Sequence, residues 1–245
     1  MVSDPGAGAW AVVPAAGRGE RFGGTLPKQY NRVLGRAVID WTLGALLEVP
    51  GVSGIMVALG IRDSHWHGLA AAADSRVHVC GGGTTRAESV SNALGALAKL
   101  GVEPERPVLV HDAARPCVRP QAVARLLGEV GNDPNGGLLG LRVRDTLKRG
   151  DESDRVTGTV ARDGLWQAQT PQLFPLGPLR EALESAALSG VAVTDEAQAM
   201  EHAGYSPRLV EGDMENLKLT LPSDLPLVEA ILSARSGAGV ERIAP

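Results

Sequence analysis

Short apolar runs alternate with stretches of helical periodicity through the first two-thirds of the chain. Runs typical of β-strands occupy residues 10–13, 54–60, 76–80, 107–111 and 137–143. Between them, apolar positions recur at helical spacing over residues 38–46, 86–100 and 120–130, and more weakly over 63–73. Strands separated by helices in this rhythm predict an α/β fold with a Rossmann-like, doubly wound and mostly parallel sheet. Its ligand site should lie at the carboxyl ends of the strands.

The last third of the chain differs, because charged residues crowd positions 142–169. That segment is too polar for a core element, and its short alternating pieces predict a β-hairpin arm that protrudes from the domain. Beyond this arm, the pattern predicts helices over 178–189 and 194–203, a strand over 208–211 and a helix over 222–234. The chain has no internal repeat or linker. We therefore expect residues 1–235 to form one domain and residues 236–245 a disordered tail.

The first apolar run opens into a loop of small residues and cations. The loop holds Ala15, Ala16, Gly17, Gly19, Gly23 and Gly24, together with Arg18, Arg21 and Lys28. Small residues let backbone N–H groups approach a polyphosphate, and the cations offset its charge, so the loop predicts phosphate binding. The glycine spacing is not that of a dinucleotide fold, and no Gly-Lys-Ser/Thr follows. An ordinary strand-to-helix turn is the alternative interpretation.

Composition narrows the class of protein. The 245 residues are 44% hydrophobic, and no run approaches the roughly 18–20 apolar residues of a membrane span, so we expect a cytoplasmic protein. Cys80 and Cys117 are expected to be free thiols, and their spacing with the histidines is not that of a zinc site. The net charge of −4 argues against a nucleic-acid partner.

Eight short motifs occur together and in order along the chain. They are Pro14-Ala15-Ala16-Gly17-x-Gly19-x-Arg21, Pro27-Lys28-Gln29-Tyr30, Gly82-Gly83-x-x-Arg86-x-x-Ser89, Val110-His111-Asp112-Ala113-Ala114-Arg115-Pro116, Arg144-Asp145-Thr146-Leu147-Lys148, Gln169-Thr170-Pro171-Gln172, Thr194-Asp195-Glu196 and Asn216-Leu217-Lys218. The set resembles the 2-C-methyl-D-erythritol 4-phosphate cytidylyltransferase family over nearly the whole chain. The resemblance implies that CTP and 2-C-methyl-D-erythritol 4-phosphate react, with Mg2+ required, to give 4-CDP-2-C-methyl-D-erythritol and pyrophosphate.

The chemistry of that reaction explains the residue types. The attacking phosphate monoester is already anionic near neutral pH, since its second pKa is about 6, so no general base is needed. The difficulty is the approach of two anionic groups, which calls for cations that hold the reacting phosphates in line. By the resemblance this role falls to Arg21, Lys28 and Lys218, although an isolated Arg or Lys is usually a solvated surface residue.

The resemblance also assigns the binding residues. Small side chains and exposed backbone groups would bind the nucleotide at Ala15, Ala16, Gly17, Gly82, Thr84 and Ser89. The alcohol phosphate would be bound by Asp112, Arg115, Thr146, Arg162, Thr170 and Thr194. Asp112 would also hold Mg2+, which takes only one or two carboxylates plus phosphate oxygens. The alternative is that Asp112 caps the following turn.

Several positions stay open. Thr84 stands where an aspartate is expected in better-known relatives, which leaves its side-chain contact with the base or ribose open. Arg115 either pairs with Asp112 or reaches the substrate. His111 is expected to be a core or strand-end residue, since the reaction asks for no base. Trp166 is expected to pack within the arm.

Two other functions share part of the pattern. A cytidylyltransferase acting on another alcohol or sugar phosphate, such as ribitol 5-phosphate, would differ only in a few arm residues. A protein that binds CTP without turnover is disfavoured by the joint presence of Lys28, Asp112 and Lys218.

The arm predicts a homodimer. An isolated hairpin is marginal in water, so we expect it to pack on the arm of a second subunit, with Thr146 and Arg162 completing the neighbour's active site. A solvated hairpin that contacts nothing is the alternative.

Overall fold

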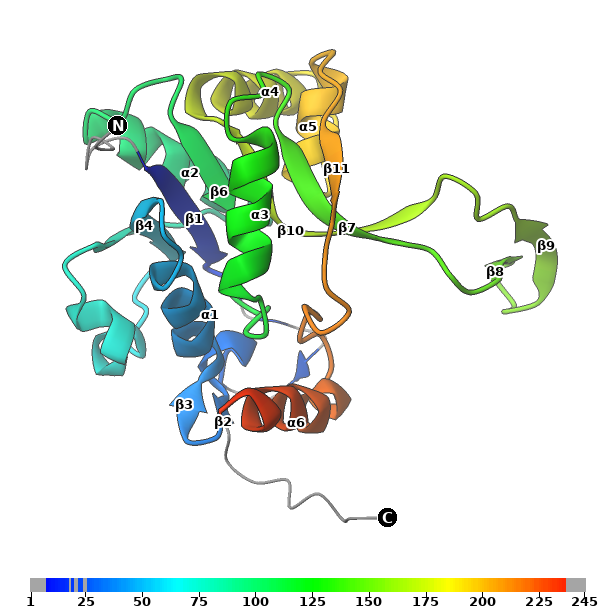
Figure 1. Cartoon of the computed structure of the whole chain (residues 1–245), viewed down its shortest axis with the longest axis horizontal. Helices are drawn as coiled ribbons and strands as arrows, with labels where there is room; N and C mark the ends of the chain where they lie inside the picture. The colour runs from blue at the N-terminus through cyan, green and yellow to red at the C-terminus, as the bar shows by residue number, and fades with distance from the viewer. Residues whose placement is uncertain (1–7, 18, 20–21, 24–25, 237–245) are drawn as a thin grey trace.

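A seven-stranded sheet forms the centre of the computed structural model, which describes residues 8–17, 19, 22–23 and 26–236 (Figure 1). The strand order is β11-β7-β10-β6-β1-β4-β5. The strands are β1 (Ala9–Ala15), β4 (Val52–Leu59), β5 (Val77–Gly81), β6 (Pro107–Val110), β7 (Gly137–Arg142), β10 (Trp166–Pro175) and β11 (Arg208–Glu211). Strand β10 runs antiparallel to β6 and β7, whereas the other pairings in this sheet are parallel. The predicted Rossmann-like, mostly parallel sheet is confirmed.

Helices cover both faces of the sheet. Helices α1 (Val38–Leu47) and α3 (Pro120–Val130) pack on one face. Helices α2 (Arg86–Lys99), α4 (Leu176–Leu188) and α5 (Glu196–His202) pack on the other. Alternate residues of β1 serve the two layers, since Ala11 and Val13 lie in one cluster and Val12 in the other. Because β1 is covered on both faces, nearly all of its residues must be apolar, which explains the continuous apolar run in the sequence.

The last helix, α6 (Leu225–Arg235), packs away from the sheet on a smaller cluster of its own. Val228 and Leu232 of α6 meet Phe22, Val38 and Leu219 there. Leu219 immediately follows Lys218, so the packing of α6 helps to fix the segment that carries this lysine. In the part of the chain that the structure describes, no helix has the length and apolar character needed to cross a bilayer.

The chain order creates a crevice beside β1. From β1 the chain moves to β4 and β5 on one side and then returns to β6 on the other side of β1. Loops after β1 and β6 therefore leave the sheet in opposite directions, which is where ligands bind in open α/β sheets. The expected place of the site, at the carboxyl ends of the strands, agrees with this topology.

Strand β10 and two smaller features differ from the sequence prediction. The sequence places residues 166–169 in the arm, but in the structure they begin β10. The strand is missed because Gln167, Gln169 and Thr170 interrupt its apolar pattern and Pro171 is typical of a strand break. Residues 63–73 form two short 3-10 helices, Trp66–Gly68 and Ala70–Ala73, instead of one weak helix. A small hairpin of β2 (Arg32–Val33) and β3 (Arg36–Ala37) was not predicted.

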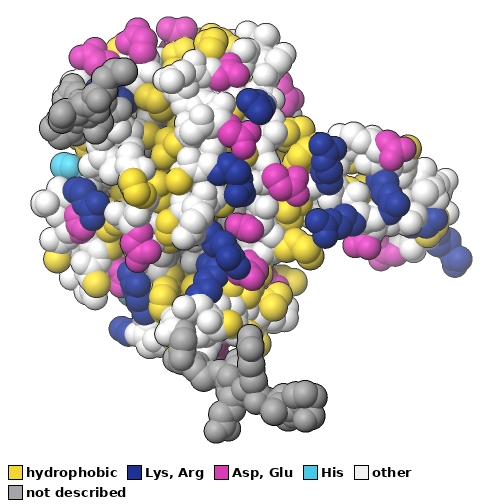
Figure 2. Space-filling model, in the orientation of Figure 1, with side chains coloured by type: hydrophobic (Ala, Val, Ile, Leu, Met, Phe, Trp, Pro, Cys, Tyr) yellow, Lys and Arg dark blue, Asp and Glu magenta, His cyan; other side chains and the backbone are white. Residues whose placement is uncertain are grey.

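The arm projects far from the domain as an antiparallel hairpin of β8 (Leu147–Gly150) and β9 (Val156–Val160) (Figure 1). It leaves the central sheet after Arg142 and re-enters it at Trp166, and these two residues pair in the ladder. Trp166 therefore packs at the base of the arm, with the Arg142 guanidinium 4.4 Å from its ring centroid. Figure 2 shows that charged side chains of both signs cover much of the surface of the arm. The predicted tail, apart from Ser236, lies outside the described residues.

Candidate active site

The side chain of Gln29 holds the start of the loop after β1. This buried residue lies in a 3-10 helix, Lys28–Tyr30, and its Nε2 donates to the carbonyl oxygens of Ala15 at 2.7 Å and Gly17 at 3.2 Å. Gly19 has φ of 72°, and a Cβ there would lie 2.9 Å from Cγ of Lys28. Glycine at this position therefore lets the loop pass close to the lysine. The motifs around Gly17 and Lys28 form one structural unit.

A second loop, between β5 and α2, lies against the first. The Thr85 hydroxyl caps α2 by accepting from the backbone N–H of Glu88, and Ser89 Oγ accepts from the N–H of Gly83 at 3.0 Å. A Cβ on Gly82 would lie 2.4 Å from Cβ of Ala16, so only glycine fits between the two loops. The N–H and hydroxyl of Thr84 both donate to Glu88 Oε2, at 2.7 and 2.6 Å.

These loops enclose a pocket with a cavity of about 210 Å³. Its lining includes most of the residues predicted for the nucleotide and its phosphates, namely Ala15, Ala16, Gly17, Lys28, Thr84, Ser89, Asp112 and Lys218. Gly82 lies behind Ala16 and is not part of the lining. Arg21, the third predicted catalytic cation, lies outside the described residues.

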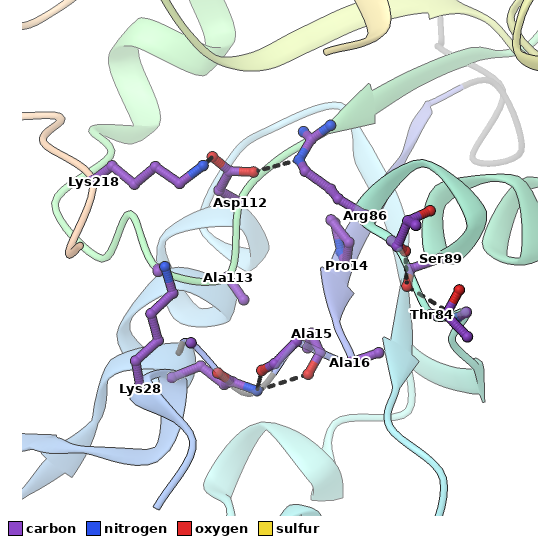
Figure 3. A pocket seen from close by; sticks show the side chains of 16 residues that line it. Pro14, Ala15, Ala16, Lys28, Thr84, Arg86, Ser89, Asp112, Ala113 and Lys218 are labelled. Carbon is purple, nitrogen blue, oxygen red and sulfur yellow. Dashed lines mark hydrogen bonds and ion pairs between the residues drawn. The ribbon is translucent and has the colours of Figure 1, made fainter. Parts of the chain in front are cut away.

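Asp112 lies where β6 ends, and cations approach its carboxylate from different sides (Figure 3). Arg86 Nε is 2.9 Å from Oδ1, while Lys218 Nζ is 2.8 Å and Arg115 Nε 3.5 Å from Oδ2. Burial alone would raise the pKa of Asp112, but Arg86 and Lys218 outweigh it and hold this pKa well below its usual range. Asp112 is therefore a permanent buried anion.

A second, smaller pocket of about 150 Å³ adjoins the first. Its lining includes predicted substrate residues, namely Asp112, Arg115, Thr170 and Thr194. Arg86, Asp112 and Lys218 line both pockets and so form the wall between them. Two neighbouring pockets with a charged wall between them suit a reaction that joins two phosphorylated molecules.

Comparison with known proteins decides the family. A family model for 2-C-methyl-D-erythritol 4-phosphate cytidylyltransferase matches residues 9–234. The chain belongs to this cytidylyltransferase family. A curated member from Halorhodospira halophila is 52% identical over 233 residues, which cover 94% of this chain and 96% of the relative. Another, from Pseudomonas fluorescens Pf-5, is 50% identical over 216 residues, with 88% and 92% covered.

Solved structures of cytidylyltransferases agree with the fold. A crystal structure of a 4-diphosphocytidyl-2C-methyl-D-erythritol synthase superposes with a TM-score of 0.81 at 38% identity, covering 92% of this chain and 98% of that one. The Francisella tularensis 2-C-methyl-D-erythritol 4-phosphate cytidylyltransferase superposes with a TM-score of 0.78 at 34% identity, covering 91% and 99%. The resemblance seen in the motifs is confirmed.

Two residues that the sequence analysis assigned to the alcohol phosphate lie apart from both pockets. Thr146 and Arg162 are exposed on the arm, and Arg162 donates to the carbonyl oxygen of Arg144. The arm strands β8 and β9 are separate from the central sheet, so these two side chains do not join the pocket of their own chain. Thr194, in contrast, lines the second pocket while its hydroxyl donates to Gln198 Oε1 at 3.0 Å.

His111 and Thr170 stabilise the strand ends behind Asp112. The Thr170 hydroxyl lies 2.9 Å from His111 Nδ1, and it accepts from the backbone N–H of Asp112 at 3.1 Å. Burial lowers the pKa of His111 to about 4, so the ring is neutral at neutral pH. His111 is a buried residue of the core, as expected. Arg115 contacts Asp112 and also donates to the Asn216 carbonyl oxygen at 2.6 Å.

The donor groups fit a magnesium ion held mainly by phosphates. Among the described residues, no group of three or more His, Cys, Asp or Glu side chains is placed to hold a metal. Asp112 is the acidic residue that lines the first pocket in the described part of the chain. Mg2+ typically takes one or two carboxylates and completes its shell with water and phosphate oxygens, so one aspartate in the lining of this pocket fits it.

Sequence reasoning left two site residues without a role. Arg86 and Glu196 were both part of the motifs, and the structure joins them in an ion pair beside Asp112, in which Glu196 is buried. Their separation of 110 positions hides the pair from any local pattern. The available signal was an unexplained acidic residue that follows the helix-capping Asp195.

Proposed function

We propose that the chain transfers the cytidylyl group of CTP to 2-C-methyl-D-erythritol 4-phosphate, giving 4-CDP-2-C-methyl-D-erythritol and pyrophosphate. The observation that carries the proposal is the wall of Arg86, Asp112 and Lys218 shared by the two pockets. The loop pocket would hold the nucleotide, and the second pocket the alcohol phosphate. The free thiols Cys80 and Cys117 support a cytoplasmic location for this protein.

The proposed mechanism rests on charge and alignment. The attacking phosphate monoester carries its own negative charge, since its second pKa is about 6, so no side chain has to remove a proton. Lys218, at the wall, would contact both reacting phosphates and hold them in line. Lys28, whose Nζ donates to the carbonyl oxygen of Leu219 beside Lys218, would stabilise the charge that develops at the α-phosphate (Figure 3). Arg21 would assist, by the family resemblance.

Asp112 would hold the magnesium ion. The ion, when bound, neutralises phosphate charge and orients the triphosphate. Asp112 is suited to this task because its neighbours keep it ionised, and because the Thr170 hydroxyl fixes its backbone N–H. Arg115 would then have two roles, because it contacts Asp112 and also lines the second pocket.

The function is tested by pyrophosphate release from CTP. The purified chain is mixed with Mg2+, CTP and one phosphorylated alcohol from a panel that includes 2-C-methyl-D-erythritol 4-phosphate and ribitol 5-phosphate. We expect release with the methylerythritol phosphate and at least about tenfold less with the others, because polar groups matched to one alcohol are left unpaired by another. CTP binding without release for any alcohol would support a binding protein and contradict the proposal.

The second subunit belongs to the same proposal. Thr146 and Arg162 lie on an arm that projects from the domain and are exposed in the single chain (Figures 1 and 2). A projecting hairpin of mixed charge gains little stability by itself. We therefore infer that the arm packs on the arm of a second copy, and that Thr146 and Arg162 reach the alcohol phosphate bound to that copy.

A further inference from the structure

Arg86 divides its guanidinium between two carboxylates. Its Nε donates to Asp112 Oδ1 at 2.9 Å, while its two terminal nitrogens donate to the oxygens of Glu196 at 2.6 and 3.0 Å. The side chain of Glu196 is only 1% exposed. A bidentate contact of this kind is the strongest that an arginine makes with a carboxylate, and here it goes to the residue farther from the pocket.

Glu196 is held rigidly at the start of α5. The preceding residue, Asp195, caps α5 through Oδ1 and accepts from Gln172 Nε2 through Oδ2, at 2.9 Å each. The following residue, Ala197, donates its N–H to Gln172 Oε1 at 2.8 Å. The buried Gln172 side chain of β10 thus holds the Asp195 side chain before Glu196 and the Ala197 backbone after it. Such bracing gives the Glu196 carboxylate one position relative to the sheet.

Among the described residues, Asp112 is the second carboxylate that pairs with Arg86. Without Glu196, the two terminal nitrogens of the partly buried guanidinium, which form its fork, would lose their partner, which is costly. The fork could then turn onto both oxygens of Asp112. Asp112 Oδ2 is the atom that Lys218 now contacts at 2.8 Å. A bidentate Arg86–Asp112 pair would therefore compete with Lys218 and with any metal for the same carboxylate.

We propose that Glu196 is a positioning residue that occupies the fork of Arg86 and so keeps Asp112 available to Lys218 and to the metal-bound nucleotide. Glu196 touches no substrate in this role and acts only through Arg86. The proposal rests on the proposed function of the site, since it assigns Asp112 and Lys218 to the reacting phosphates.

The test uses Glu196→Gln, which keeps the shape of the side chain but removes its charge. We expect kcat to fall at least tenfold while KM for the alcohol phosphate changes less than threefold. Apart from turnover, CTP binding is measured by calorimetry with Mg2+ and again with a chelator in place of Mg2+. The variant should lose most of the gain in CTP affinity that Mg2+ gives the parent, and its metal-free affinity should stay the same.

Rescue separates positioning from a structural role. Lysine has no fork and cannot hold both oxygens of Asp112, so adding Arg86→Lys to Glu196→Gln should recover at least threefold in kcat. Glu129→Gln is the matched control, because it removes an exposed ion pair between Glu129 of α3 and Arg208 of β11, neither of which lines either pocket. This control should match the parent in turnover and in the effect of Mg2+.

Two results would overturn the role of Glu196. One is a Glu196→Gln protein that folds and keeps the parent's kcat and Mg2+ effect; the other is a double variant no better than the single one. Glu196→Asp, which keeps the charge but shortens the reach, provides the same readouts if Glu196→Gln fails to fold, and it should show an intermediate loss. A parent chain that releases no pyrophosphate would contradict the proposed function instead, and CTP calorimetry would still test Glu196.

Discussion

The carboxylate of Asp112 shows how a single residue can carry much of a site. A buried anion is costly unless it is paired, and this one is paired with Arg86 and Lys218. The pairing keeps Asp112 ionised and also holds both cations at the boundary of two pockets. One side chain thus fixes the charge and the geometry of the wall.

Replacing Asp112 by Asn keeps the shape of this residue and removes its charge. We expect the Asp112→Asn variant to need a higher Mg2+ concentration for half-maximal pyrophosphate release, because an amide oxygen is a weaker magnesium ligand than a carboxylate. The measurement is a Mg2+ titration at saturating CTP. A titration curve that superimposes on the parent's would mean that Asp112 is not a metal ligand.

Lys28 tests the charge argument at a second cation of the same pocket. Its Nζ donates to the Leu219 carbonyl oxygen at 3.2 Å, so the ammonium is already positioned in the free protein. Lys28→Ala should lower kcat by about two to three orders of magnitude, since a preorganised charge at the transition state contributes on the order of 3–4 kcal/mol. Lys99→Ala, at the exposed end of α2, is the control and should be unchanged. Normal turnover by Lys28→Ala would remove the phosphate-loop interpretation.

The elements of the fold depend on glycine where two segments pass closely. Gly136, just before β7, has φ of 63°, and a Cβ there would lie 2.2 Å from the Leu173 carbonyl oxygen of β10. Gly136→Ala should therefore lower the free energy of unfolding by at least about 2 kcal/mol. Gly128 in α3 has open space around it, and Gly128→Ala should raise that free energy by about 0.5–1 kcal/mol. Urea titration measures both, and equal effects would contradict the close-approach argument.

Most of the elements could be predicted from sequence because their patterns are local. The apolar runs of β1, β4 and β6 and the helical spacing of α2 and α3 follow from burial on one or two faces. Strand β10 could not be found in this way. Its polar residues are satisfied by distant partners, as when Gln169 Nε2 donates to the Asp213 carbonyl oxygen at 2.9 Å.

The candidate site was predictable to the extent that its residues share short motifs. Lys28, Asp112 and Lys218 line one pocket, as the motif set suggested. The Arg86–Glu196 pair was not predictable, because it depends on how α5 docks against β10. Motifs indicate which residues matter, whereas the contacts between elements determine what each residue does.

At the scale of the whole molecule, the arm is tested by mixing subunits. Asp112→Ala and Arg162→Ala proteins should each be nearly inactive. Refolded together, they should recover about a quarter of the parent's activity, because half of the dimers are hybrids and each hybrid has one intact site. The matched control mixes Asp112→Ala with Lys28→Ala, whose altered residues line the same pocket of one chain, and should recover nothing. Hybrid dimers that stay inactive would place Arg162 outside the neighbour's site.

The contact between Lys28 and Leu219 joins positions 191 residues apart, so the order of synthesis matters. At about 5–20 residues per second, roughly 10–40 s pass between the emergence of the two partners from the ribosome. Strand β6 also lacks one of its neighbours when it is synthesised, since it pairs with β10, which comes later in the chain, from residues 166–175. Until β10 has emerged, the nascent chain presents β6 as an open sheet edge, which is a template for pairing with other chains. Protection of this edge by a chaperone, or a pause in translation after β10, would therefore matter more for the yield of this protein than for its final stability.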